Sequence, residues 1–355
     1  MNLTPIKAML KAILGPYYEV IKDYILFPMY DVIADLWTPD ENLFIPYLIM
    51  SILISYPVYR TQIAAGESGS LRHFLRFLIP ARIYKHKSAI LDYKFYIVNS
   101  YVSKILFGWI LIGSSNLIGS SINSTLNHVL GKPGPQWQPT ATSRIVYTLL
   151  IVVVFDLGAY LAHYLEHRIQ VLWEFHKTHH SAEVLTPITT FRNHPVDEVL
   201  ENIFISVFVG SLTAVFSYLY PSGIEQYKII NVSVLMFLYF FVANLLHSHV
   251  WLSYGWVLNH IFYSPCMHQI HHSSEQRHFD CNFGRVFSVW DKIFGTLYVP
   301  REKEELRYGI SNNEHLAFTS VWSCYFVPFK KAFAHLKPQS SELNTTVIND
   351  SKDVL

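Results

Sequence analysis

The sequence has few charged side chains for its length of 355 residues. Asp, Glu, Lys and Arg together make up 15% of it, whereas a typical soluble domain has about 25%. The 27 basic and 26 acidic residues nearly cancel, so the chain lacks the basic excess typical of nucleic acid binding, and we expect no nucleic acid partner. Three cysteines without CxxC spacing cannot form a disulfide scaffold. Neither GxGxxG nor GxxxxGKS/T occurs, so no nucleotide site is expected.

Apolar residues are abundant instead, at 51% of the total, and they gather into long runs. Five runs approach the roughly 20 residues that a helix needs to cross a bilayer, namely residues 43–63, 95–118, 144–165, 199–220 and 228–247. The alternative is a set of buried core helices in a soluble protein, but five such runs are difficult to bury without lipid. We therefore predict an all-α fold, built as a multi-span transmembrane helical bundle with a cytoplasmic helical cap.

The distribution of basic residues predicts how the runs are oriented. Basic residues gather in the loop after the first run, at Arg72, Arg76, Arg82, Lys85 and Lys87. Such a loop favours the cytoplasm. Loop 119–143 contains one lysine and no arginine, so we expect it on the outer side. We predict a multi-pass integral membrane protein of a bacterial inner membrane or the endoplasmic reticulum. We expect no cleavable signal peptide, because Pro5, Lys7 and Lys11 interrupt any short apolar core.

Histidine is frequent, with 18 residues, and its spacing is patterned. Residues 163–167 read HxxxH, residues 176–180 and 268–272 both read HxxHH, and residues 247–249 read HxH. On a helix, positions i and i+4 lie about 40° apart around the axis, so His163 and His167 share a face. The last two histidines of HxxHH point about 100° apart. One helical turn can therefore offer one imidazole to each of two ions.

The number of patterned histidines exceeds the needs of one ion, because structural zinc takes four ligands and catalytic zinc three. Imidazole suits iron, zinc and copper. We predict that the cytoplasmic cap holds a dimetal site. Its candidate ligands and catalytic residues are His163, His167, His176, His179, His180, His247, His268, His271 and His272. Ligating histidines usually donate their second N–H to a carboxylate or carbonyl, and Asp156 and Asp280 are the candidates for that role.

Two alternatives remain open at this point. A single histidine is usually an ordinary core or surface residue, which is our interpretation of His73, His86, His128, His315 and His335. A non-enzymatic zinc-binding or zinc-transport membrane protein is the alternative of another class. Transport requires ionisable residues along a path through the bilayer, whereas the patterned histidines are expected at one membrane face.

The histidine motifs occur with other recognisable segments. They are LWEFHKTHHS at 172–181, RNHP at 192–195, SP at 264–265, DCNFG at 280–284 and WDKIFGT at 290–296. In order and spacing, residues 156–300 resemble the fatty acid hydroxylase/sterol desaturase superfamily of integral-membrane, histidine-rich di-iron oxygenases. The resemblance is closest to its sterol-desaturase-like members.

This resemblance implies two iron ions, O₂ as co-substrate and oxidation of a C–H bond in a bilayer lipid at the cytoplasmic face. It also implies an external electron donor of the cytochrome b5 or ferredoxin type with its reductase, and zinc can replace iron on purification. The family's ligand positions fall on the nine histidines. His194, in RNHP, and His249 are additional candidates. Many members have Asn where this chain has His249, which leaves open whether His247 or His249 is the ligand.

We therefore predict an O₂-dependent di-iron oxidoreductase that hydroxylates or desaturates a lipid. A sterol-type substrate is the first choice, and a fatty-acyl or alkylglycerol hydroxylase is the alternative. The expected organisation is an interfacial amphipathic segment 1–42, an N-terminal transmembrane region 43–143 with the basic loop, a catalytic domain 144–300, and a C-terminal region 301–355 with a disordered tail.

Overall fold

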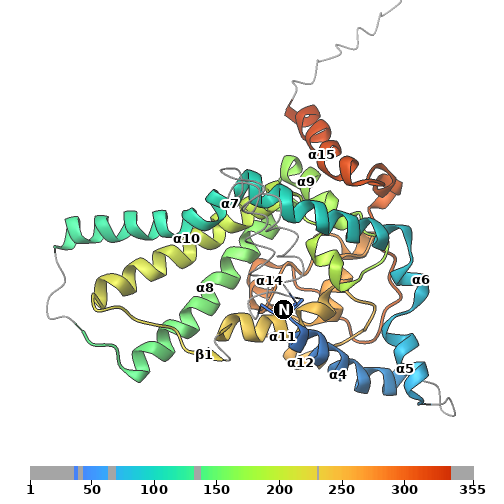
Figure 1. Ribbon diagram of the computed structural model, residues 1–355, viewed down its shortest axis with the longest axis horizontal. Coiled ribbons are helices and arrows are strands. Elements are labelled where there is room, and N and C mark those ends of the chain that lie inside the picture. The colour runs from blue at the N-terminus through green and yellow to red at the C-terminus, as the bar shows by residue number, and fades with distance from the viewer. Residues whose placement is uncertain (1–35, 39–42, 63–68, 132–136, 230–231, 337–355) are drawn as a thin grey trace, which may run out of the picture.

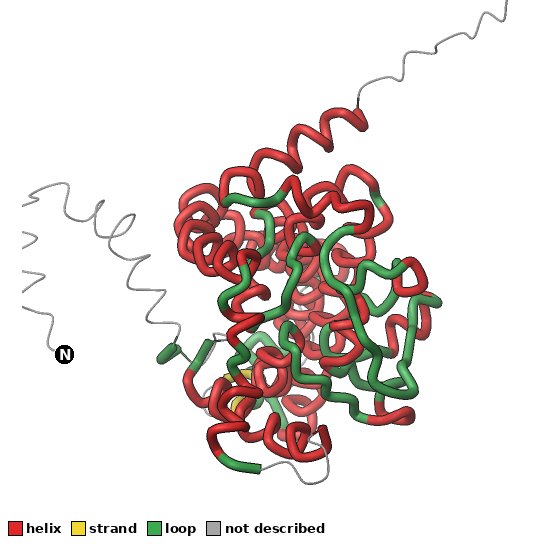
Figure 2. Tube along the Cα trace, turned by 90° about the vertical axis from the view of Figure 1, so that its right-hand side faces the viewer, coloured by secondary structure: helices red, strands yellow, loops and turns green. Residues whose placement is uncertain are grey.

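The computed structural model describes residues 36–38, 43–62, 69–131, 137–229 and 232–336. The predicted interfacial segment and the predicted disordered tail lie outside these residues, except for a few positions. Helices dominate the trace, and the described residues add one small antiparallel hairpin (Figure 2). The predicted helical fold class is confirmed.

The elements are α4 Ile45–Gln62, α5 Leu71–Leu78, α6 Ala81–Tyr84, α7 Lys87–Leu130, α8 Ala141–Arg168, α9 Gln170–His180, η3 Pro187–Phe191, α10 Pro195–Leu219, β1 Lys228–Ile229, β2 Val232–Ser233, α11 Val234–Leu246, α12 Gly255–Leu258, α13 Pro265–His271, η4 Gln276–His278, α14 Val289–Phe294, η5 Ser311–Ala317 and α15 Val321–Leu336.

Three long helices, α7, α8 and α10, form an arm that projects from the more compact remainder of the molecule (Figure 1). Helix α10 packs against both α7 and α8. Helix α8 begins at a capping box, in which the Thr140 and Ser143 side chains each accept the backbone N–H of the other residue. Gly158 lets α8 approach α10 closely, because a Cβ there would lie 3.0 Å from the Ile205 Cα. The arm therefore holds the end of α8 close to α10 where the histidines begin.

Helices α8 and α10 are, among the described residues, the two that are long and apolar enough to cross a membrane. They correspond to the predicted runs 144–165 and 199–220. Run 43–63 forms the 18-residue α4, and run 95–118 lies inside the 44-residue α7. Run 228–247 differs from the expectation, since it starts as a hairpin and is helical only over the 13 residues of α11. The β-branched Ile229 and Val232 favour extended backbone, and the remaining helix spans only about 20 Å.

A buried ion pair ties the arm to the region of the histidine motifs. The Arg192 guanidinium donates to Asp92 Oδ1 on α7 at 2.8 Å, and both side chains are at most 1% exposed. The same guanidinium donates to the carbonyl oxygens of Thr178 on α9 and Phe318 before α15. Asp92 also accepts the Thr189 hydroxyl of η3 at 2.7 Å. One residue of the RNHP motif thus joins four segments that are distant in sequence.

We expect Asp92→Ala to destabilise the fold, because it leaves the buried Arg192 charge without its carboxylate. Removing one partner of a buried pair costs about 3–5 kcal/mol, which unfolding of the detergent-solubilised protein by heat or denaturant would measure. Glu275→Ala is the matched control, because its partner Arg277 is 56% exposed. Equal shifts in the two variants would contradict the role of the Arg192 pair.

Candidate metal centre

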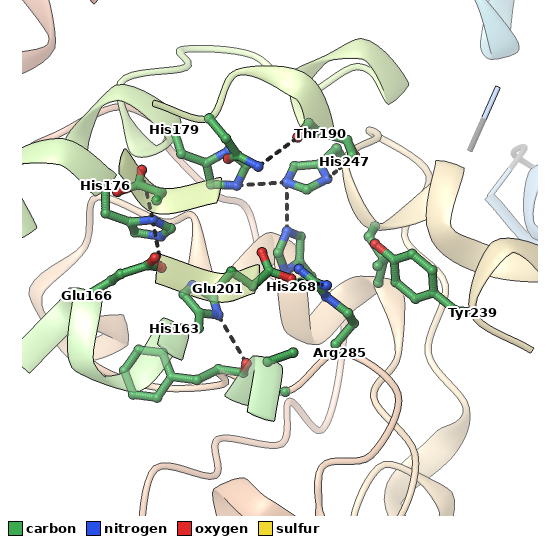
Figure 3. Close-up of a pocket in the computed structure, with 16 residues that line it drawn as sticks. His163, Glu166, His176, His179, Thr190, Glu201, Tyr239, His247, His268 and Arg285 are labelled. Carbon is green, nitrogen blue, oxygen red and sulfur yellow. Dashed lines mark hydrogen bonds and ion pairs between the residues drawn. The ribbon is translucent and has the colours of Figure 1, made fainter. Parts of the chain in front are cut away.

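All nine patterned histidines converge on one region from four segments of the chain. Helix α8 contributes its last turns, α9 and α13 contribute the two HxxHH motifs, and the residue after α11 contributes one imidazole. Figure 3 shows five of these rings around one cavity. The nine form two groups, in each of which one ring nitrogen per histidine lies within 4.8 Å of the others. The first group is His163, His167, His176, His180 and His271, and the second is His179, His247, His268 and His272.

The first group has the donor set of a metal site. The Nε2 atoms of all five rings are buried and have no hydrogen-bond partner. A buried polar nitrogen without a partner costs about 1–3 kcal/mol, so five of them facing one another are unfavourable unless a cation accepts their lone pairs. His163 and His167 lie one turn apart on α8 and both face this point.

The second group converges more tightly. The Nε2 atom of His247 lies 3.1 Å from that of His179, 3.1 Å from that of His272 and 2.8 Å from that of His268. Four nitrogens around a tetrahedral ion with bonds of about 2.0–2.1 Å would lie about 3.3 Å apart. The residues of this group therefore also fit a metal ion.

The two HxxHH motifs divide their rings between the groups in opposite ways. Helix α9 gives its first and last histidine, His176 and His180, to the first group and His179 to the second. Helix α13 gives His271 to the first group, whereas His268 and His272 belong to the second. Because adjacent helical residues point about 100° apart, one turn of each helix supplies both groups.

The second nitrogen of several rings is held by a specific partner. His163 Nδ1 donates to the Phe283 carbonyl oxygen at 3.0 Å, and His271 Nδ1 donates to that of Cys281 at 2.9 Å. A ring that donates from Nδ1 presents the Nε2 lone pair to the centre. His247 Nδ1 lies 2.7 Å from the Thr190 hydroxyl oxygen.

Two buried carboxylates flank one ligand candidate. Glu166 Oε2 and Asp197 Oδ2 lie 3.2 Å and 3.7 Å from His176 Nδ1. Burial lowers the pKa of His176 to about 3, and it lowers the pKa of His179 and His180 as well. These imidazoles are therefore neutral at pH 7 and keep a lone pair for a cation.

The structure places the two additional candidates outside both groups. His194 caps α10, where Nδ1 accepts the Val196 N–H and Nε2 lies 3.2 Å from the Tyr325 carbonyl oxygen. His249 Nε2 lies 2.6 Å from the Phe77 carbonyl oxygen. Of the pair left open by the sequence, His247 is thus the one that joins a group.

The two carboxylates expected to support ligands differ in their placement. Asp280 Oδ1 lies 3.9 Å from His167 Nδ1 and also pairs with Arg168. Asp156 is fully buried but accepts hydrogen bonds from the backbone of residues 286 and 287 and from Trp290. It therefore fixes a loop and contacts none of the nine histidines. The roles of Thr190 and of the two carbonyls carry no signal in the sequence, whereas Glu166 and Asp197 are recognisable as carboxylates near the motifs.

Two cavities border the centre, and they have no lining residue in common. The first, of about 80 Å³, touches His163, His176, His179, His247 and His268, and so reaches both groups (Figure 3). The second, of about 210 Å³, touches His167, His180 and His271 of the first group.

These features define a helical protein with two apolar helices of membrane-spanning length and a buried centre of nine imidazoles. Residues 148–296 match the model of the fatty acid hydroxylase family. The predicted resemblance is thereby confirmed over those residues.

Several curated proteins are similar to this chain. An ornithine lipid hydroxylase of Rhizobium tropici is 29% identical over 46% of this chain and 45% of the relative. A Delta(7)-sterol 5(6)-desaturase of Gibberella zeae is 31% identical over 44% of this chain and 42% of the relative. The human alkylglycerol monooxygenase is 31% identical over 51% of this chain and 35% of the relative. The chain spans less than half the length of these relatives. No solved structure matches the chain.

We expect His247→Ala to weaken metal binding by at least about 10-fold, because even the hydrogen-bond partners of ligands are worth about 10–100-fold. The measurement is the metal retained after dialysis against a chelator, determined by mass spectrometry. His249→Ala is the matched control, two residues away and bonded to a carbonyl instead. Greater metal loss in the His249 variant would reassign the ligand.

Proposed function

We propose that this chain is a membrane-bound, O₂-dependent di-iron oxidoreductase that hydroxylates or desaturates a lipid. The observation that supports this most is the convergence of nine buried imidazoles into two groups within a fatty acid hydroxylase domain. The nine histidines would hold two iron ions, one in each group. Iron bound there supplies O₂ activation and oxidation of an unactivated C–H bond, chemistry that no side chain performs.

The protein's own residues orient the ligands and keep bulk water away. Phe283 and Cys281 fix two rings through their carbonyl oxygens, and the Glu166 carboxyl group flanks Nδ1 of a third ring, that of His176. The ligand side chains of α9 and α13 are buried. A dry, preorganised site of this kind favours controlled oxidation over side reactions.

We further propose a multi-pass topology with the centre at the cytoplasmic face. The charged residues and histidines of the apolar α8 and α10 lie toward the centre, except for Arg144 at the opposite end of α8. From residue 202 to residue 219, α10 contains no Asp, Glu, Lys, Arg or His. This one-sided arrangement favours a site reached from one membrane face over a zinc-transport path through the bilayer.

The electron donor and the substrate are also proposals. We propose an external cytochrome b5-type or ferredoxin-type donor with its reductase, which reaches the centre from the side of the second cavity. A sterol-type lipid is the first choice of substrate. An alkylglycerol or fatty-acyl substrate is the second candidate, supported by similarity to alkylglycerol monooxygenases from four animals at 24–31% identity.

We expect the iron-loaded protein, supplied with a reductant and a lipid extract, to consume O₂ and to yield lipid products with an added oxygen atom or a lost hydrogen pair. His179→Ala and His271→Ala, one from each group, should each lower the rate by more than about 100-fold, since ligand loss abolishes the centre. An oxygen electrode and lipid mass spectrometry are the measurements.

The control for this experiment is the same protein loaded with zinc, which has no redox chemistry. Lipid oxidation by the zinc-loaded protein, or full activity in either histidine variant, would refute the proposed function.

A further inference from the structure

The first cavity is lined by charged residues as well as by histidines. Arg285 and Glu201 form an ion pair there, and the Arg285 guanidinium lies over the Tyr239 ring at 5.6 Å from its centroid (Figure 3). The pair is not sealed, because the two side chains are 30% and 25% exposed. A polar pair that stays accessible inside a cavity beside the candidate metal centre is available to a substrate.

The backbone around Arg285 is fixed on both sides by buried carboxylates. Asp291 accepts the N–H groups of residues 283 and 284 at 2.7 Å and 3.0 Å. Asp156 accepts those of residues 286 and 287 at 2.8 Å and 3.1 Å. Both aspartates are fully buried. Arg285 is thus held at the cavity by a rigid loop, as a recognition residue requires.

The charged residues that line the cavity favour some polar groups of a bound lipid over others. Glu166, Asp197 and Glu201 place three carboxyl groups on the cavity, against one guanidinium from Arg285. An anionic phosphate or carboxylate would meet the Glu201 carboxylate, and a cation would meet Arg285. An uncharged hydroxyl can accept from the guanidinium and donate to the Glu201 carboxylate at the same time. A pure hydrocarbon would remove water from the pair without replacing its hydrogen bonds.

The size of the cavity limits how far the hydroxyl group of a lipid can lie from the carbon that is oxidised. A volume of about 80 Å³ is far smaller than a whole lipid and also smaller than the about 300–1,000 Å³ of a typical ligand pocket, so only one end of a lipid fits. The same cavity touches histidines of both groups. We propose that Glu201 and Arg285 bind an uncharged hydroxyl group that lies within a few bonds of the lipid carbon to be oxidised. This inference rests on the proposed function and specifies the substrate class of that site.

Sterols and alkylglycerols both carry such a hydroxyl, and two pairs of probes distinguish them. The first pair is cholesterol and 5-cholestene, which lacks the hydroxyl. The second is 1-O-hexadecylglycerol and hexadecyl propyl ether, which lacks both hydroxyls. Binding is measured on the full iron-loaded chain in lipid nanodiscs without reductant, so that no turnover occurs. We expect the hydroxylated lipid of at least one pair to bind about 10- to 100-fold more tightly.

Substitution of the pair tests the assignment of the residues. Glu201→Gln and Arg285→Met should bring the two affinities of that probe pair to within about 3-fold of each other, and Arg285→Lys should retain part of the preference. Metal content, unchanged in these variants, shows that the fold is kept. Arg168→Met is the matched control, because Arg168 also has an acidic partner and an aromatic ring, Asp280 and Tyr164, but does not line this cavity.

Equal affinities for the hydroxylated and deoxy lipids in both pairs would overturn the inference. So would a preference that survives in both Glu201→Gln and Arg285→Met. A hydroxyl preference in binding without O₂-dependent turnover would refute the proposed function but leave the binding of the hydroxyl by Glu201 and Arg285 supported, so the two failures are distinguishable.

Discussion

The structure depends on nine neutral imidazoles whose ring nitrogens face one another in a buried space. Burial keeps these rings uncharged, as the lowered pKa of His176 illustrates, and neutral rings present lone pairs that repel unless a cation lies between them. The rings come from α8, α9, the residue after α11, and α13. The remaining fold must hold these four segments in place, and the Arg192–Asp92 pair, which joins α7, α9, η3 and the approach to α15, contributes to this.

The loop of residues 283–287 links the candidate metal centre to the candidate substrate cavity. Its Phe283 carbonyl orients His163, and two residues later Arg285 enters the cavity. The Asp156 and Asp291 carboxylates both accept hydrogen bonds from the backbone N–H groups of this loop. A displacement of the loop would therefore disturb the His163 ring and the Arg285–Glu201 pair together.

Local spacing accounts for the part of the centre that was predictable. HxxxH and HxxHH have meaning because a helix repeats every 3.6 residues, so His163 with His167, and the division of each HxxHH motif, follow from short-range geometry. The HxH spacing has no helical phase and leaves the choice between His247 and His249 open. In the structure, the chain after α11 turns the His247 ring to the centre and the His249 ring to the Phe77 carbonyl oxygen. Hydropathy predicts one helix over run 228–247, because hydropathy alone does not distinguish a β-branched hairpin from the beginning of a helix.

Composition and short-range spacing establish the helical class, the nine histidines that converge and the family resemblance, because these depend on residues close together in the chain. The packing of the helices settles which ring joins which group, that Asp156 supports a loop, and that Glu201 on α10 meets Arg285, which lies 84 residues further along the chain. Contacts between distant segments depend on how whole helices pack, and no local pattern of residues encodes that packing.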